Sequence, residues 1–230
     1  MTLPLSELLL PTLYSLLHST CVHLGLSVLV AMALSAPYIA HAQQHGDFLF
    51  QDLDCGPLCD AIEAVTPAFD GRHFSHVGLV ERRGDSLYVV EAISRGGVVR
   101  TPLAGFLSRA VDSSGRPAFT SMRLAPQHAD LLGRALAFCD SAMGTPYDEV
   151  YLLDNGAYYC SELLYEAFRA ANDGEAFFAL HPMTFRRPGG RAFDPAWVAY
   201  YEALGTSIPE GQPGCNPGGL AVGGRLVRTE

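Results

Sequence analysis

The sequence predicts an α+β protein in which helices pack against one antiparallel sheet. Two observations carry this prediction. Three short segments rich in Val, Ile, Leu and Tyr follow one another between residues 74 and 101, with only short turns between them. Two longer segments between residues 126 and 171 then place apolar side chains at helical spacing. Strands this close in sequence pair as an antiparallel meander, and the helices that follow cover it.

Turn-forming residues separate the predicted strands. The first strand follows Gly46, Gly84 and Gly96 divide the three strands of the meander, and a further strand follows the loop that ends at Pro117. Glycine and proline are the residues that most strongly interrupt a strand. The strands are predicted at residues 47–51, 74–80, 87–93, 97–101 and 119–124.

Three helices are predicted around these strands. The first covers 57–65 and has Pro in its first turn, where a missing N–H costs little. The second covers 126–143 and ends before Gly144, as helices often do. The third covers 158–171. From residue 172 onward the chain is rich in Pro, Gly and aromatic residues, and we predict that it wraps the core as irregular structure.

Residues 1–42 differ in composition from the rest of the chain. They carry one formal charge, at Glu7, and contain an apolar run over 24–36 that is followed by Ala40-His41-Ala42. A short apolar run and a small-x-small site are typical of a cleaved signal peptide. We therefore predict that 1–42 is a signal peptide, that 43–230 is a single domain, and that the protein is periplasmic or secreted. An uncleaved membrane anchor is the alternative, and only then would the protein contact a membrane.

Charge excludes one class of partner. The chain has 15 basic residues, all of them Arg, against 24 acidic residues, and its net charge is −9. Proteins that bind nucleic acids need a basic patch or stripe to neutralise phosphates. We find no such stripe with interleaved aromatic residues, and nucleic-acid binding is not expected.

The predicted meander brings a histidine and a carboxylate together. Glu91 lies in an apolar strand, where a buried carboxylate needs a partner. If Arg83 and Gly84 form the hairpin loop, His76 lies directly opposite Glu91; if Gly84 and Asp85 form it, His76 lies on the diagonal. Side chains alternate with period two, so either loop keeps both residues on one face. A carboxylate beside an imidazole fixes its tautomer and raises its basicity.

Cys160 is the candidate nucleophile. It is predicted near the start of the helix over 158–171, on the same stripe as Leu163 and Leu164. A buried cysteine with no chemical role would show the same pattern. However, the N–H groups and dipole at a helix N-terminus favour the thiolate and can stabilise an oxyanion. If the first turn of this helix packs on the sheet, Cys160 reaches the face that carries His76 and Glu91.

Several segments together resemble one known family. They are Phe-Ser-His-Val-Gly-Leu-Val at 74–80, Val-Glu-Ala at 90–92, Gly-Thr-Pro-Tyr-Asp at 144–148, and Tyr-Cys-Ser-Glu-Leu at 159–163. Their order and spacing resemble the YiiX-type, circularly permuted papain-like hydrolases of the NlpC superfamily, over essentially all of residues 46–220. The histidine strand precedes the cysteine helix, which is the permuted order.

The resemblance implies a permuted papain-like fold and a Cys–His–Glu triad on Cys160, His76 and Glu91, with no metal or organic cofactor. It also implies cleavage of amide bonds in cell-wall peptides or related amides, so the expected partner is a peptide or acyl-amide substrate, including peptidoglycan fragments. Two alternatives remain open. One is an acyltransferase or lipid amidase that uses the same site, and the other is a non-catalytic module that binds the cell wall.

Other cysteine and histidine residues are weaker candidates. A zinc site at Cys55 and Cys59 is conceivable, but their four-residue spacing without a second pair is a weak signal. His73 lies three residues before His76 and is expected on the opposite side of the strand. Disulfide pairing cannot be deduced from sequence, and it remains open among four of the cysteines. These are Cys55, Cys59, Cys139 and Cys215.

Overall fold

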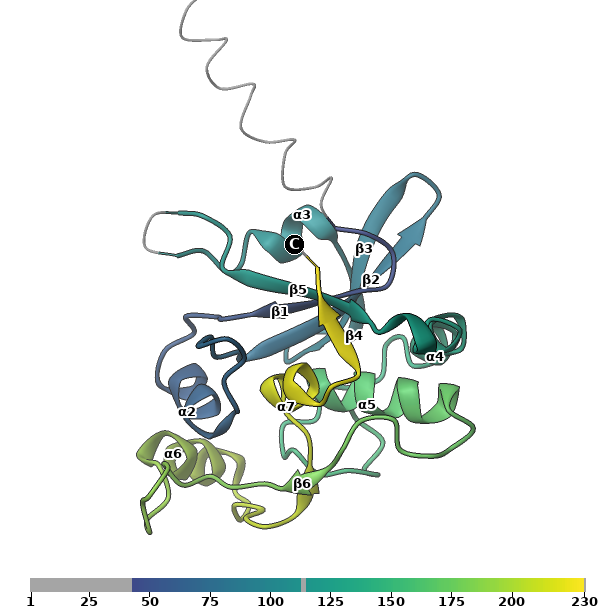
Figure 1. Ribbon diagram of the computed structural model, residues 1–230. Coiled ribbons are helices and arrows are strands. Elements are labelled where there is room, and N and C mark those ends of the chain that lie inside the picture. The colour runs from purple at the N-terminus through teal and green to yellow at the C-terminus, as the bar shows by residue number, and fades with distance from the viewer. Residues whose placement is uncertain (1–42, 113–114, 230) are drawn as a thin grey trace, which may run out of the picture. The chain divides into compact units, whose positions relative to one another are not determined.

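The computed structural model describes residues 43–112 and 115–229. The predicted signal segment lies outside these residues. The main feature is a six-stranded antiparallel sheet with the order β4-β3-β2-β1-β5-β8, covered by helices (Figure 1). The strands of this sheet are β1 (Asp47–Gln51), β2 (His76–Arg83), β3 (Ser86–Ile93), β4 (Gly97–Pro102), β5 (Phe119–Leu124) and β8 (Leu226–Arg228). The predicted α+β class and the antiparallel sheet are confirmed.

The meander of β2, β3 and β4 follows the second of the two predicted registers. Arg83 pairs with Ser86, so Gly84 and Asp85 form the hairpin loop. Gly84 has φ 57°, a backbone conformation that glycine adopts without strain. Continued along the strands, this register places His76 diagonally from Glu91.

The two faces of the sheet carry separate apolar clusters. The first face carries the larger cluster and packs against α4 (Leu131–Ser141) and α5 (Cys160–Ala171). The other face is covered by α3 (Leu103–Leu107), a short helix that the sequence analysis did not predict. The first face presents residues such as Phe48, Val77, Leu79 and Val90. The second presents Leu49, Val80 and Val89 with Phe106 of α3.

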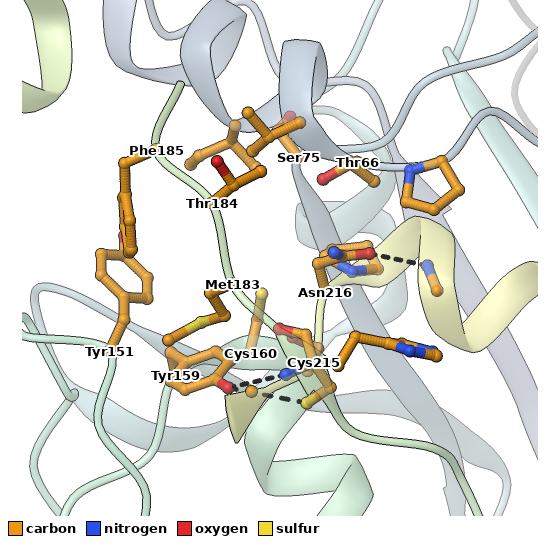
Figure 2. A pocket seen from close by; sticks show the side chains of 18 of the residues that line it. Thr66, Ser75, Tyr151, Tyr159, Cys160, Met183, Thr184, Phe185, Cys215 and Asn216 are labelled. Carbon is orange, nitrogen blue, oxygen red and sulfur yellow. Dashed lines mark hydrogen bonds between the residues drawn. The ribbon is translucent and has the colours of Figure 1, made fainter. Parts of the chain in front are cut away.

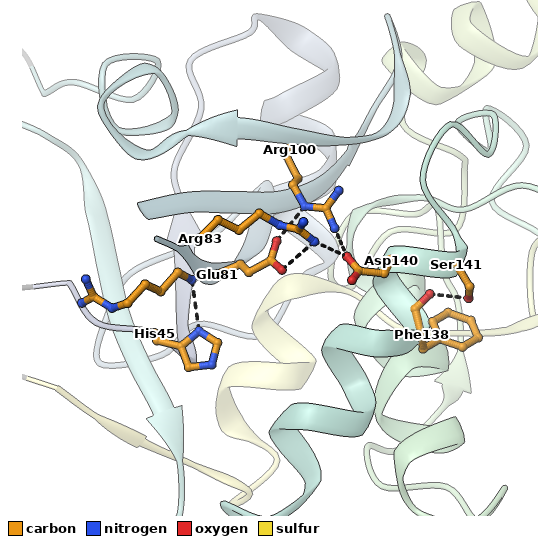
Figure 3. A network of polar contacts seen from close by, with 8 residues as sticks. His45, Glu81, Arg83, Arg100, Phe138, Asp140 and Ser141 are labelled. Atoms are coloured by element: carbon orange, nitrogen blue, oxygen red, sulfur yellow. Dashed lines mark hydrogen bonds and ion pairs between the residues drawn. The ribbon is translucent and has the colours of Figure 1, made fainter. Parts of the chain in front are cut away.

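Ion pairs fasten α4 to the edge of the sheet (Figure 3). Glu81 of β2 accepts a hydrogen bond of 2.6 Å from Arg100 of β4. Arg83 donates to Asp140 of α4 at 2.7 Å, and Arg100 also contacts that carboxylate.

The helix predicted over 126–143 is divided in the structure. A single 3-10 turn, η1 (Pro126–His128), precedes α4.

The chain beyond residue 172 is more regular than predicted. It contains α6 (Pro195–Leu204), α7 (Pro217–Val222), β8 and a two-stranded pair of β6 (His181–Pro182) and β7 (Pro213–Gly214). α6 packs against α2 (Pro57–Val65) around the buried rings of Phe185, Trp197 and Tyr201. β8 pairs with β5 and completes the sheet (Figure 1). The expectation of irregular structure was wrong for this part of the chain.

Candidate active site

His76 and Glu91 form a direct, buried hydrogen bond. His76 is the first residue of β2 and Glu91 lies in β3. The imidazole Nε2 lies 2.6 Å from Glu91 Oε2, and the Glu91 side chain is 0% exposed. The sequence analysis predicted that these two side chains share a face. That face is the one covered by α3, because Glu91 lies two residues from Val89 along β3 and therefore points to the same side as Val89.

Glu91 remains an anion because several donors surround it. Burial by itself would raise the pKa of this carboxyl group, but hydrogen bonds from His76, Arg109 and Thr101 hold the pKa below its ordinary value. Arg109 Nη2 lies 2.8 Å from Oε1 and 2.6 Å from Oε2. Thr101 of β4 donates its hydroxyl to Oε1. A carboxylate with this many donors is a fixed negative charge next to the imidazole.

His76 connects Glu91 to Cys160. Its Nε2 is committed to Glu91, which leaves Nδ1 free to interact with the Cys160 thiol, the other group that raises the pKa of the ring. Burial by itself would lower the pKa of His76, but the hydrogen bonds with Cys160 and Glu91 raise it to about 9. A protonated imidazole in this position stabilises a thiolate beside it. The structure therefore brings the three predicted residues together.

Cys160 is the first residue of α5, and Tyr159 is the residue that caps this helix. The N–H of Tyr159 donates to Glu162 at 3.3 Å, which ties the first turn together. Cys160 is a buried, free cysteine. Its own N–H belongs to the first turn, where N–H groups have no acceptor within the helix and the dipole favours negative charge.

The route by which Cys160 reaches His76 differs from the expectation. The apolar stripe of α5 packs on the face that carries Val77 and Val90, not on the face of His76 and Glu91. Cys160 and His76 are each the first residue of their element, so they meet where β2 begins. The contact between Cys160 and His76 requires only that α5 starts beside the beginning of β2. It does not depend on which face of the sheet the apolar side of α5 covers.

A cavity of about 200 Å³ opens beside Cys160. Figure 2 shows Tyr151 and Phe185 on one side of it, Thr66 and Asn216 on the other, and Cys160 at one end. The described lining residues include no Asp, Glu, Lys or Arg, and His76 is not among them. The cavity is therefore largely apolar, with the Cys160 sulfur on its wall and His181 as the described lining residue that can carry a positive charge.

A second thiol lies in the same wall. Cys215 follows β7 and also lines the cavity. Its N–H donates to the Tyr159 hydroxyl at 3.1 Å, and its carbonyl accepts from the Ser161 hydroxyl at 3.2 Å. Burial raises the pKa of the Cys215 thiol to about 12. Cys139 is likewise buried in the core, with a pKa raised to about 12 for the same reason. Both thiols stay protonated at neutral pH.

The remaining cysteine and histidine candidates have structural partners. Cys55 and Cys59 form a disulfide at the start of α2, so they do not hold zinc. Within residues 43–112 and 115–229, no group of three His, Cys, Asp or Glu side chains could hold a metal ion. His73 lies outside β2, is exposed, and contacts the Glu63 carbonyl at 3.2 Å.

No helix in the described part of the chain has the length and apolarity needed to cross a bilayer.

The sequence analysis missed two residues of the site, Thr101 and Arg109. Thr101 pairs with Val89 across β3 and β4, so it shares the face of Glu91. The alternation of side chains along the meander could have identified it. Arg109 follows a five-residue helix, and no periodic pattern predicted where that helix would pack.

Comparison with known proteins assigns the chain to a family. The model of a family described as "permuted papain-like amidase enzyme, YaeF/YiiX, C92 family" matches residues 42–221. The chain belongs to this permuted papain-like amidase family. The family consists of papain-like amidases or cysteine peptidases, so the protein is an enzyme of that type.

A solved structure has the same fold as this permuted papain-like amidase. It is the YiiX protein of Escherichia coli O157:H7, which is described as a metalloprotein. The two chains are 21% identical; the match covers 82% of this chain and 97% of that one, with a TM-score of 0.63. We found no match among curated protein sequences. The predicted YiiX-type permuted papain-like fold is confirmed.

Proposed function

We propose that this permuted papain-like amidase cleaves amide bonds by a Cys–His–Glu triad on Cys160, His76 and Glu91. One observation carries the proposal. The imidazole of His76 is hydrogen-bonded to a buried carboxylate and interacts with the Cys160 thiol, which lines a cavity. A nucleophile, a base and a group that orients the base are the three parts required for acyl transfer to a thiol.

The proposed reaction proceeds through a thioester. The Cys160 thiolate attacks the amide carbonyl carbon, and the N–H of Cys160 stabilises the oxyanion that forms. The His76 imidazolium gives its proton to the leaving amine as the C–N bond breaks. The imidazole then takes a proton from water, which attacks the thioester and releases the acid and the Cys160 thiolate, so that the starting thiolate–imidazolium pair is restored. Glu91 holds the ring through Nε2 throughout.

Alkylation of the cysteines tests the nucleophile separately from any substrate. A thiolate paired with an imidazolium reacts with iodoacetamide several pH units below an ordinary thiol, whose pKa is about 8.5. Mass spectrometry after labelling at pH 6 should find Cys160 modified. Cys139, a buried thiol with a raised pKa, is the internal control and should stay unmodified. Equal labelling of both residues, or of neither, would contradict an activated Cys160.

The substrate is proposed to be an amide of a cell-wall peptide or a related amide. The largely apolar cavity favours an apolar group on the acyl side of the bond, because a charged group would lose its water there and would find no Asp, Glu, Lys or Arg partner among the described lining residues. Amine release should be measured from two sets of substrates, muropeptides and amides with apolar acyl groups. Cleavage of muropeptides alone would contradict the apolar acyl side, and cleavage of neither set would contradict the amidase proposal.

The same cavity favours a second candidate function, acyl transfer. An apolar wall around the thioester keeps water away, so an amine or alcohol acceptor could take the acyl group in its place. Adding a primary amine to the reaction separates the two. A new amide product that grows with amine concentration supports transfer, whereas release of the free acid alone supports hydrolysis.

Export is proposed from the predicted signal segment at residues 1–42, and the Cys55–Cys59 disulfide supports it. Disulfides persist in oxidising compartments such as the bacterial periplasm and are rare in the cytosol. The test is N-terminal sequencing of protein from the periplasmic fraction of its host. A mature terminus near Gln43 is expected, and an intact Met1 on soluble protein would contradict cleavage.

A further inference from the structure

Glu91 has more hydrogen-bond donors than a triad needs. His76 contacts one of its oxygens, Thr101 contacts the other, and Arg109 Nη2 reaches both, at 2.8 and 2.6 Å. The side chain of Arg109 is 33% exposed, whereas that of Glu91 is 0% exposed. The guanidinium therefore extends inward from a half-buried position to a carboxylate that water does not reach.

Arg109 is held in place independently of Glu91. Its guanidinium carbon lies 4.8 Å from the centre of the Phe106 ring, a cation–π distance. Phe106 is fixed in turn, because its carbonyl accepts a hydrogen bond of 2.8 Å from Gln51. Gln51 pairs with His76 across β1 and β2, and the Phe106 ring lies 5.8 Å from the imidazole. The segment around Arg109 is thus anchored to β1, the strand that pairs with β2, where His76 lies.

We propose that Arg109 is a positioning residue, which orients the Glu91 carboxylate toward His76 and partly neutralises its charge. This inference rests on the proposed triad. A carboxylate whose two oxygens both accept from Arg109 Nη2 cannot turn away from His76 Nε2, so the ring keeps its orientation toward Cys160. The positive charge of Arg109 also weakens the pull of Glu91 on the imidazolium proton. Without Arg109 the imidazolium would hold that proton more tightly and give it up less readily.

Among the groups around the His76–Glu91 pair, Arg109 is the one whose replacement changes the local charge. α5 contributes the Cys160 thiol, β4 contributes the uncharged Thr101, and β1 contributes the uncharged Gln51. Arg109 is the cation among the described residues that contact Glu91, apart from His76 itself. A change in the titration of His76 on replacing Arg109 can therefore be assigned to that charge.

The test compares two substitutions of Arg109 with a matched control. Arg109→Gln keeps a donor and removes the charge, whereas Arg109→Lys keeps the charge and removes the planar guanidinium. Arg123 is the control residue, because it also pairs with a buried carboxylate, Asp47, at 2.6 Å and is 36% exposed. Arg123→Gln removes a similar ion pair from the same sheet, away from the triad. The measurements are the His76 titration by NMR, kcat against pH, and Tm.

We expect Arg109→Gln to raise the pKa of His76 by roughly half a unit to one unit, since two unit charges about 4 Å apart interact by about that much where water screens them, and the Arg109 side chain is partly exposed. The pH at which kcat declines on the alkaline side of its profile should rise by the same amount, and the maximum kcat should fall about tenfold. Arg109→Lys should leave the titration unchanged and lower kcat less. Arg123→Gln should lower Tm without moving the titration.

An unchanged His76 titration in Arg109→Gln, with a fall in Tm like that of Arg123→Gln, would show that Arg109 only stabilises the fold. If Arg109→Gln does not fold, Arg109→Lys decides the matter, because a positioning role requires its kcat to fall. Wild-type kcat in folded Arg109→Lys would then overturn the proposal. The NMR titration needs no substrate. An enzyme that cleaves no amide would refute the proposed function, while the titration would still report on Arg109.

Discussion

The hydroxyl of Tyr159 accepts a hydrogen bond of 3.1 Å from the N–H of Cys215 and lies 3.7 Å from the Cys215 sulfur. Tyr159 caps the helix that begins with Cys160, and Cys215 lies 56 residues further along the chain. This contact joins the C-terminal segment to the start of the helix that carries Cys160, so the end of the chain helps to fix the position of Cys160.

Replacing Tyr159 by Phe should destabilise the protein and disturb the site. The change leaves the buried N–H of Cys215 without its acceptor, which costs about 1–3 kcal/mol. Urea unfolding measures the loss. Tyr158→Phe, a hydroxyl deletion one residue away, is the control and should cost less. Equal stability of the two variants would contradict a supporting role for the Tyr159 hydroxyl.

Cys160→Ser should abolish turnover while the protein stays folded. A serine hydroxyl in this place does not form the anion that attacks the amide. Amine release is the assay, and circular dichroism checks the fold. Cys139→Ala, which removes a thiol from the core, should keep its turnover despite a lower Tm. Residual activity near wild type in folded Cys160→Ser would exclude Cys160 as the nucleophile.

Glu91→Gln should be severely damaging. The Glu91 carboxylate accepts from His76, Thr101 and Arg109, and an amide has one accepting oxygen and an NH₂ group that would face one of these donors. We expect kcat to fall roughly a hundredfold or more, in the range of general acid–base effects. Glu81→Gln is the control, because Glu81 is also a buried carboxylate paired with an arginine. A similar loss of kcat in both variants would deny Glu91 a specific role.

The rate should decline as pH rises through about 9, the raised pKa of His76. Above it the imidazole has lost the proton that the leaving amine requires. Stability should follow the same direction. Because the folded-state pKa exceeds the ordinary 6.5, the protonated ring adds stability that is complete below pH 6.5 and lost as pH rises through about 9. Unfolding of wild type and His76→Gln across this range measures the difference, which should shrink with rising pH.

Removing the Cys55–Cys59 disulfide should lower stability modestly. The bond joins cysteines only 4 residues apart, and closing so short a loop is worth roughly 2 kcal/mol in the chain-entropy account. A variant with Ser at both positions should unfold at lower urea concentration and should no longer respond to dithiothreitol. A wild-type protein whose unfolding is the same with and without dithiothreitol would contradict this expectation.

Sequence patterns predicted the core of the site because it lies on regular strands. Side chains of a meander alternate strictly, so His76 and Glu91 had to share a face in either register. The face of the sheet that α5 covers was not predictable in the same way. Packing of a helix depends on tertiary contacts, and the stripe of α5 fits the face opposite to the one expected. The first residue of α5 nevertheless reached His76, because that contact depends on where the helix starts.

The helix α6 shows a prediction that local signals would have allowed. Asp194 caps it by accepting a hydrogen bond from the Ala196 N–H at 2.9 Å, Pro195 begins it, and Gly205 ends it with φ 68°. These are the usual residues at such positions. The abundance of Pro, Gly and aromatic residues obscured them. Arg109 had no comparable signal, because its place depends on how α3 packs.

The permuted order affects how the enzyme matures during synthesis. His76 and Glu91 lie in consecutive strands and can pair early, since N-terminal segments tend to fold first. Cys160 emerges much later, and the segment that contacts the start of its helix, around Cys215, is made last. Until then the Tyr159 hydroxyl lacks the hydrogen bond from the N–H of Cys215. The surroundings of Cys160, the residue for which we propose the role of nucleophile, are therefore complete only after the C-terminal segment has docked.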